Sequence, residues 1–76
     1  MTDYKKYIER NPKLMLGKPV IKGTRITVEH IMRKLAGGYS IEELEKNIPH
    51  LTKEQILAAL EYAADMIANE ENIKTV

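Results

Sequence analysis

The stretch GKPVIKGTRITV, from Gly17 to Val28, places two glycines and a proline within twelve residues of a 76-residue chain. Glycine adopts positive φ at no steric cost and proline holds φ near about −65°, so both residue types constrain the path of the backbone. Val20 to Lys22 is a candidate strand within this stretch, and Gly23 interrupts the apolar pattern as a bulge or a residue with φ > 0 does. We therefore predict a tightly defined bend at this point of the chain.

A second candidate strand, Tyr7 to Glu9, lies upstream of the bend. Pro12 and Gly17 bracket the turn that separates it from the strand at Val20 to Lys22. Two short runs joined by a turn that contains Pro and Gly are typical of a β-hairpin. We therefore expect the two strands to pair.

The residues after the bend carry the start and stop signals of two helices. Thr27 suits the N-cap of a first helix, in which apolar residues recur at helical spacing until Gly37 and Gly38 stop it. The sequence SIEE, from Ser40 to Glu43, is a capping box for a second helix, because the serine oxygen accepts from a backbone N–H and the glutamate reaches back to the cap. Pro49 ends this second helix.

A third and longest helix opens with a second capping box, TKEQ at Thr52 to Gln55, and runs to about Asn69. Between Ile56 and Ala68, eleven of thirteen residues are apolar and the exceptions are Glu61 and Asp65. A helix that is apolar nearly all round is usually buried from more than one side, so we expect a homodimer or another partner here. The alternative is that the five alanines are good helix formers that tolerate water. The candidate interface residues are Ala59, Tyr62, Ala63, Met66 and Ile67.

These elements predict a mainly α fold: a three-helix, helix-turn-helix-like domain preceded by a short N-terminal β-hairpin. We expect a single domain over 1–76, with the hairpin and junction at 1–27, the helices at 28–69 and a tail at 70–76. A chain this short buries only about 60% of the surface that its unfolded form exposes, so self-association would help its stability.

The composition favours a cytoplasmic protein. The chain has no cysteine, so no disulfide or cysteine zinc site is available and a reducing compartment fits. No apolar run approaches the roughly 20 residues of a membrane span, and the opening MTDYKKYIER lacks the apolar core of a signal peptide. We therefore expect no membrane partner.

The net charge of +1 conceals an uneven distribution along the chain. Met1 to Lys34 holds nine Lys or Arg and three acidic residues, a balance of +6, whereas the rest holds three Lys and eight acidic residues, a balance of −5. Such a division marks a basic surface for nucleic acid or an acidic surface for a basic partner. Two solvated faces that attract each other, within the monomer or across a dimer, are the alternative.

The second and third predicted helices, joined by a short turn, have the spacing of a helix-turn-helix. A recognition helix of this type needs Arg, Lys, Asn or Gln at its exposed N-terminal positions, and Lys53 and Gln55 are the candidates here. Glu54 and the acidic residues further along would repel the DNA backbone, so this helix alone is a weak reader. The basic residues lie instead in the opening ribbon, and its candidate phosphate contacts are Lys18, Lys22 and Arg25.

No enzyme signature is found in the sequence. His30 and His50 are the only histidines, and their separation of twenty residues favours structural roles over metal binding or base catalysis. Gly17 and Gly23 lack the strand-to-helix context of a phosphate-binding loop. We therefore expect no catalytic residues, no metal site and no cofactor.

The segment from Asn11 to Ala64 resembles a known bacterial and archaeal family, domain of unknown function 433. The resemblance lies in GKPVIKGTRI, in GYSIEEL of the second predicted helix, and in PHLTKEQILAALEYA, which leads into the third. It implies a small helix-turn-helix protein of the homeodomain-like or winged-helix-like class. Many family members sit beside genes for PIN-like ribonuclease toxins, which implies an antitoxin that masks a toxin nuclease and represses its own operon.

The resemblance also implies a structural motif in the opening stretch. A tight turn around Lys18 would lead into the strand, a glycine would let the backbone bend, and side-chain hydrogen bonds would tie the bend to the helices. The residues of this motif are Gly17, Pro19, Gly23, Thr24 and Arg25.

Two roles are open for Arg25. Its guanidinium has five donors in a rigid fork, which suits carbonyl groups, a carboxylate such as Glu29 or Glu43, or a phosphate. It is therefore either a structural tie or, together with Lys22, a nucleic-acid contact that dimer symmetry would double.

Two functions of different classes follow. The first is an antitoxin-type regulator, a helix-turn-helix dimer that binds operator DNA and a PIN-like toxin. The second is a protein interaction or assembly module that does not bind DNA, which the acidic third helix favours. A PIN-type active site is a cluster of acidic residues that holds a metal, so a basic arm, either the terminal KTV or Lys22 with Arg25, would plug it better than the acidic Glu61, Asp65, Glu70 and Glu71.

Overall fold

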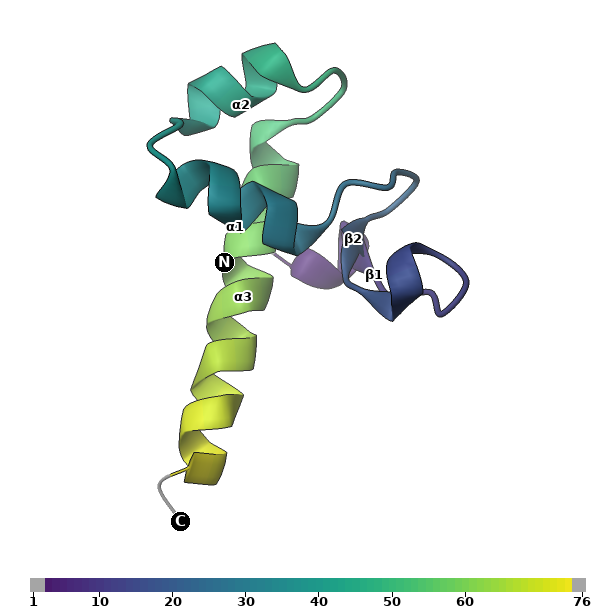
Figure 1. Ribbon diagram of the computed structural model, residues 1–76, viewed down its shortest axis with the longest axis vertical. Helices are drawn as coiled ribbons and strands as arrows, with labels where there is room; N and C mark the ends of the chain where they lie inside the picture. The colour runs from purple at the N-terminus through teal and green to yellow at the C-terminus, as the bar shows by residue number, and fades with distance from the viewer. Residues whose placement is uncertain (1–2, 75–76) are drawn as a thin grey trace.

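The structure, a computed structural model, describes the backbone of residues 3–74 and the side chains of residues 3–69. It has the predicted fold class, with a two-stranded hairpin followed by three helices (Figure 1). Strand β1 (Ile8–Glu9) pairs antiparallel with β2 (Val20–Ile21), so that Ile8 lies opposite Ile21 and Glu9 opposite Val20. The predicted hairpin is confirmed, and each strand is one residue shorter than expected.

The predicted bend closes on itself through hydrogen bonds around Gly23, whose φ is +77°. The backbone N–H of Ile21 donates to the carbonyl oxygen of Ile26 at 2.9 Å. The hydroxyl of Thr24 donates to the carbonyl oxygen of Ile21 at 2.8 Å and accepts from the N–H of Ile26 at 3.0 Å. The Thr24 hydroxyl thus closes the loop between β2 and the first helix, but it bonds within the bend and not, as predicted, to a helix.

Helix α1 (Val28–Ala36) begins directly after this bend, with Thr27 as its N-cap. The Thr27 hydroxyl accepts from the backbone N–H of His30 at 3.0 Å, which satisfies one of the free donors of the first turn. The helix ends before Gly37, as predicted. Gly38 follows with φ +102°, a conformation that side chains with a Cβ rarely adopt.

Helices α2 (Ile41–Asn47) and α3 (Lys53–Lys74) both begin with the predicted capping boxes. In α2 the N–H of Glu43 donates to the hydroxyl of Ser40 at 3.1 Å, and the N–H of Ser40 donates to the Glu43 carboxylate at 2.9 Å. Thr52 and Gln55 make the same two hydrogen bonds at the start of α3, at 3.2 and 2.9 Å. Local sequence signals thus decide where each helix starts.

The three helices and the hairpin share one apolar core. Its buried members come from β1, β2, all three helices and the α2–α3 connection. Figure 1 shows α1 crossing α3, α2 beside the N-terminal end of α3, and the hairpin beside the start of α1. The buried core residues are Ile8, Ile21, Val28, Ile31, Leu44, Leu51, Ile56, Ala58 and Ala59.

Helix α3 is longer than predicted, since it continues past Asn69 to Lys74. The predicted tail at 70–76 is therefore helical through Lys74, and 75–76 lie outside the described residues. No Gly or Pro occurs in this segment to stop the helix. The C-terminal half of α3 projects beyond the rest of the chain (Figure 1).

Replacement of Thr24 tests whether its hydroxyl holds the bend. We expect Thr24→Val to lower the free energy of unfolding by about 1 kcal/mol, because the carbonyl of Ile21 and the N–H of Ile26 each lose a partner. Thr24→Ser keeps the hydroxyl and serves as the matched control. Urea unfolding followed by circular dichroism measures both. Equal stability of the Val and Ser variants would contradict this role.

Candidate functional site

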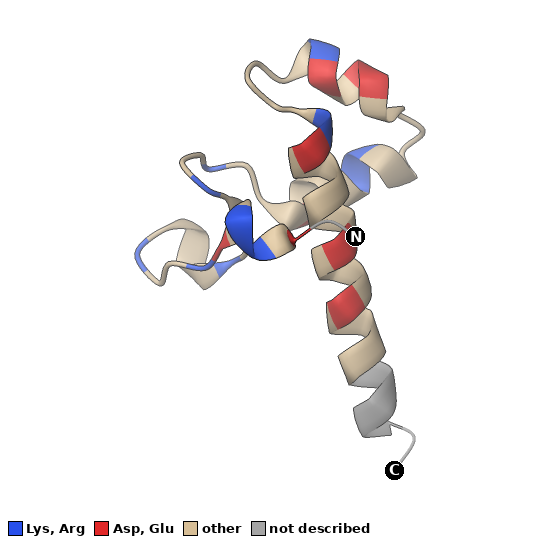
Figure 2. Cartoon of the chain, turned by 180° about the vertical axis from the view of Figure 1, so that it is seen from behind, with Lys and Arg blue, Asp and Glu red and all other residues tan. Residues whose placement is uncertain are grey.

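The basic residues gather on one side of the molecule. From Arg10 to Val28 the chain carries five Lys or Arg and no acidic residue. This segment, which we call the basic arm, comprises the loop between β1 and β2, strand β2 itself, and the loop between β2 and α1. In Figure 2 the blue segments of both loops project from one side of the body, whereas most of the red lies on α2 and α3.

The bend presents Lys22 and Arg25 on a rigid loop. Both side chains are exposed. They flank Gly23 and Thr24, whose conformation is held by the hydrogen bonds between Ile21 and Ile26. Two cations on a loop of fixed shape lose little backbone entropy when they bind a charged partner.

The predicted structural tie through Arg25 is not formed. Among the described residues, Arg25 makes no side-chain hydrogen bond or ion pair with Glu29, Glu43 or any other group. Backbone hydrogen bonds and the Thr24 hydroxyl close the loop without it. The hydrogen bonds predicted from Arg25 to Glu29 or Glu43 are therefore absent among the described residues, and a nucleic-acid contact through its guanidinium stays a prediction.

Lys18 is engaged differently from the other cations of the arm. Its ammonium group lies 3.1 Å from the Glu29 carboxylate, which also accepts from the Arg33 guanidinium at 3.1 Å. Hydrogen bonds from Lys18 and Arg33 lower the pKa of Glu29 from its ordinary value. The charge of Lys18, a predicted phosphate contact, is thus partly compensated by Glu29. No described ion pair compensates the charges of Lys22 and Arg25.

The start of α3 is poorly suited to a polyanion. Lys53 is exposed at the first residue of the helix, but Glu54 follows it and the neighbouring α2 carries three more glutamates. The side chain of Gln55 is committed to the capping box with Thr52. Lys53 and Gln55 are therefore close to acidic residues in the sequence and belong to a different element from the cations of the basic arm.

Three of the five predicted interface residues pack within the chain itself. Ala59 is fully buried, and Tyr62 and Ala63 pack against the core. The ring of Tyr62 meets Tyr4 edge to face at 5.4 Å between centroids, and the Arg10 guanidinium lies 5.9 Å from the centre of the same ring. Only Met66 and Ile67 of the predicted set are exposed.

Tyr4, the other member of this aromatic pair, also lies beside Asp65 of α3. Its contact with the Asp65 carboxylate, together with partial burial, raises the pKa of the Tyr4 hydroxyl. The short 3-10 turn at Tyr4–Lys6 thus packs against α3 through its tyrosine.

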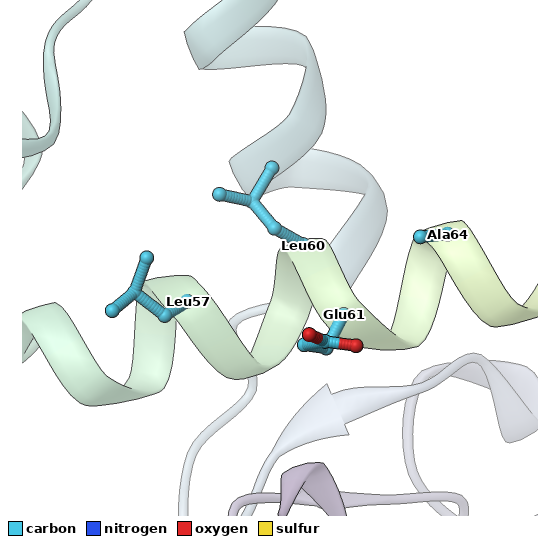
Figure 3. A pocket seen from close by; sticks show the side chains of 4 residues that line it. All are labelled: Leu57, Leu60, Glu61 and Ala64. Atoms are coloured by element: carbon cyan, nitrogen blue, oxygen red, sulfur yellow. The ribbon is translucent and has the colours of Figure 1, made fainter. Parts of the chain in front are cut away.

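An apolar stripe that we did not predict follows the side of α3 that faces away from the core. Leu57, Leu60 and Ala64 project from the helix beside Glu61 and line a shallow hollow (Figure 3). Ile67 continues the stripe one turn further and is 56% exposed. The stripe residues are separated by three, four and three positions, and this spacing is visible in the sequence. However, the sequence of an almost wholly apolar helix does not show which side of the helix packs against the core of the chain.

The two histidines lie apart from any metal-binding arrangement. Within residues 3–69, no group of three or more His, Asp or Glu side chains is arranged to hold a metal ion. His30 is exposed on α1, and His50 is exposed in the α2–α3 connection with φ +67°. No helix in the described part of the chain is long and apolar enough to cross a membrane.

The fold and the surface define a small helix-turn-helix-like module with a basic hairpin arm. The chain belongs to the family described as Protein of unknown function (DUF433), whose model matches residues 8–63. The uncharacterized protein y4eO of Sinorhizobium fredii is 34% identical over 56 residues, a match that covers 74% of this chain and 25% of that protein. This chain thus spans about a quarter of the length of that curated relative. No solved structure matches this chain.

The Glu29 ion pairs give a prediction about pH. Because Lys18 and Arg33 lower the pKa of Glu29, the pairs stabilise the fold above the ordinary value of 4.5 and lose this effect as the pH falls through the lowered value. We expect Glu29→Gln to unfold at lower urea concentration than the wild type at neutral pH, with the difference shrinking below pH 4.5. Urea titrations at several pH values measure this. A difference that does not change with pH would contradict the ion-pair account.

Proposed function

We propose that this protein is an antitoxin-type regulator: a helix-turn-helix-like homodimer that binds operator DNA and neutralises a PIN-like ribonuclease toxin. The observation that carries the DNA half of the proposal is the basic arm, with five cations and no acidic residue between Arg10 and Val28. The toxin half rests on the resemblance to a family whose genes neighbour those of PIN-like ribonucleases.

The basic arm suits the phosphate backbone of a duplex. Lys13, Lys22 and Arg25 are exposed, and no described hydrogen bond or ion pair occupies their charged groups. Each phosphate that a protein cation neutralises releases counterions, which favours binding and makes it dependent on salt. In this proposal the duplex lies along the arm, as it does along the wing of a winged helix, and the acidic α2 and the start of α3 stay away from the phosphates.

A titration against the DNA upstream of the protein's own gene tests the arm. We expect Arg25→Ala and Lys22→Ala to weaken binding several-fold and to lower the slope of log affinity against log salt by about 0.9 for each phosphate that the variant no longer neutralises. Lys53→Ala is the matched control, because it removes a cation in acidic surroundings, and it should leave the slope unchanged.

Unrelated DNA of the same length measures the non-specific part of the binding. Loss of affinity in Lys53→Ala but not in the arm variants would contradict this placement of the duplex and would assign DNA to the helix-turn-helix instead. Absence of selective binding by the folded wild type would overturn DNA recognition by the isolated protein.

The apolar stripe on α3 supports the dimer. Isolated helices shorter than about 12–15 residues are marginal in water, so the projecting half of α3 gains from a second helix beside it. An antiparallel copy would set Leu57 against the partner's Ile67 and Leu60 against the partner's Ala64. Around the two-fold axis, Leu57 would then pack against a large side chain and Leu60 against a small one. This packing removes the exposed apolar side chains from water.

A charge in the stripe tests the dimer. We expect Leu60→Glu to convert the dimer into a folded monomer, because two glutamates would be buried at the centre of the interface. Asn69→Glu is the control, since Asn69 is exposed on the other side of α3. Light scattering after size exclusion gives the mass of each variant. A wild type that is monomeric at high protein concentration, or an unaltered dimer in Leu60→Glu, would contradict this interface.

Two surfaces fit the toxin. The basic arm is the better plug for the acidic, metal-binding site of a PIN-like nuclease, and in that case toxin and DNA would compete for Lys22 and Arg25. The terminal KTV, the other basic candidate, lies outside the residues whose side chains are described. The acidic edge of α3, with Glu61 and Asp65, would instead meet a basic surface of the toxin.

The second candidate function is a protein interaction module that does not bind DNA. The observation that favours it is the acidic character of α2 and of the start of α3, the helices that would otherwise cross the DNA backbone and enter the major groove, respectively. In this case the apolar stripe and the arm would both contact protein. A dimer that shows no selective, salt-dependent DNA binding would favour this function.

A further inference from the structure

The tip of the basic arm holds an apolar side chain in an unusual backbone conformation. Met15, Leu16 and Gly17 have φ values of +50°, +58° and +79°, so three successive residues are left-handed. Only glycine adopts this region without steric cost, and two of the three are not glycine. The Leu16 side chain is 93% exposed, the highest value among the exposed large hydrophobic residues of the described chain.

Hydrogen bonds fix this turn. The N–H of Leu14 donates to the carbonyl oxygen of Asn11 at 2.8 Å, that of Gly17 to Leu14 at 3.0 Å, and that of Lys18 to Met15 at 3.1 Å. The Asn11 side chain also accepts from the N–H of Lys13 at 2.9 Å. Leu16 is therefore held outward by a closed turn, and it does not fold back onto the core.

Three cations of the arm lie near this tip. Lys13 and Lys18 flank the turn in the sequence, and Met15 lines one shallow hollow together with Arg25 and His30. The tip thus combines one projecting leucine and a partly exposed methionine with nearby positive charges. No acidic side chain belongs to the loop between Arg10 and Pro19.

We propose that Leu16 is a wedge that inserts between base pairs in the minor groove of duplex DNA, while the cations of the basic arm hold the phosphates on either side. The inference rests on the proposed DNA binding and names how the arm engages the duplex. Minor-groove proteins combine the same two features, an apolar side chain that unstacks a base step and Arg or Lys beside it. The charge favours DNA over a protein pocket, because Lys13, Lys22 and Arg25 are exposed and no described ion pair compensates them, although Lys18 is paired with Glu29.

A wedge has two measurable consequences. It kinks the duplex, and it favours pyrimidine–purine steps, which unstack most easily. Its contribution to affinity is apolar, so its removal should not change the number of phosphates that the protein neutralises. Removal of one buried leucine side chain corresponds to about tenfold or more in affinity.

The experiment measures the bend and the affinity together. A duplex of the upstream sequence carries a donor and an acceptor fluorophore at its ends, and energy transfer at saturating protein reports the bend. We expect the wild type to shorten the end-to-end distance. Leu16→Ala should abolish this change and bind about tenfold more weakly, with an unchanged salt slope. Leu16→Met keeps a wedge and should retain the bend.

Two controls separate the wedge from other effects. Tyr39→Ala truncates an exposed large side chain between α1 and α2, outside the arm and the apolar stripe, and should leave bend and affinity unchanged. Arg25→Ala should lower the salt slope while the saturated complex remains bent. Leu16 is almost fully exposed, so its truncation leaves the core intact, which circular dichroism verifies.

The outcomes distinguish the wedge from the proposed function. Wild-type binding without a bend, or a bend that persists in Leu16→Ala, would overturn the wedge and leave binding by the basic arm in place; Leu16 would then be assigned to a protein partner. No DNA binding by the wild type would overturn both.

Discussion

Two backbone hydrogen bonds close the loop from Pro19 to Val28, and the position of the basic arm relative to the helices depends on them. The N–H of Ile21 donates to the Ile26 carbonyl and the N–H of Val28 to the Pro19 carbonyl, each at 2.9 Å. Together they join the end of the hairpin to the first turn of α1, so that Ile21, Val28 and Ile31 enter one core. The same closure turns Lys22 and Arg25 outward, because the loop needs neither side chain for its own hydrogen bonds.

Charge and apolar surface are separated by this arrangement. The basic arm carries five of the twelve Lys and Arg residues and no acidic residue, whereas α2 and α3 carry eight of the eleven acidic residues. An apolar stripe follows the outer side of α3. A protein with such a division can hold a polyanion and a protein partner at once without one blocking the other. This division is the reason that the proposed DNA contact is assigned to the arm and not to the third helix.

Local signals predicted the fold well, and long-range contacts account for what they missed. The caps at Thr27, Ser40 and Thr52 act on residues three positions away, so local sequence signals located them, whereas the role of Thr24 was implied by the family resemblance. The predicted bond from Arg25 to Glu29 is not formed, and Glu29 instead accepts from Lys18, eleven residues upstream, and from Arg33. The left-handed Met15 and Leu16 had no sequence signal, since neither residue type marks positive φ. Because α3 is apolar on nearly all sides, its sequence does not show which side meets the core. We therefore predicted Ala59 at the interface, whereas it is buried in the core.

The central claim is that the basic arm, and not the helix-turn-helix, meets DNA. Backbone amide shifts of the labelled protein, followed by NMR during titration with its own upstream duplex, test this claim residue by residue. The account predicts the largest changes at Leu14–Lys18 and Lys22–Ile26, with small changes through α2 and the first turn of α3. The largest changes at Lys53–Ile56 and in α2, with the arm unaffected, would contradict it.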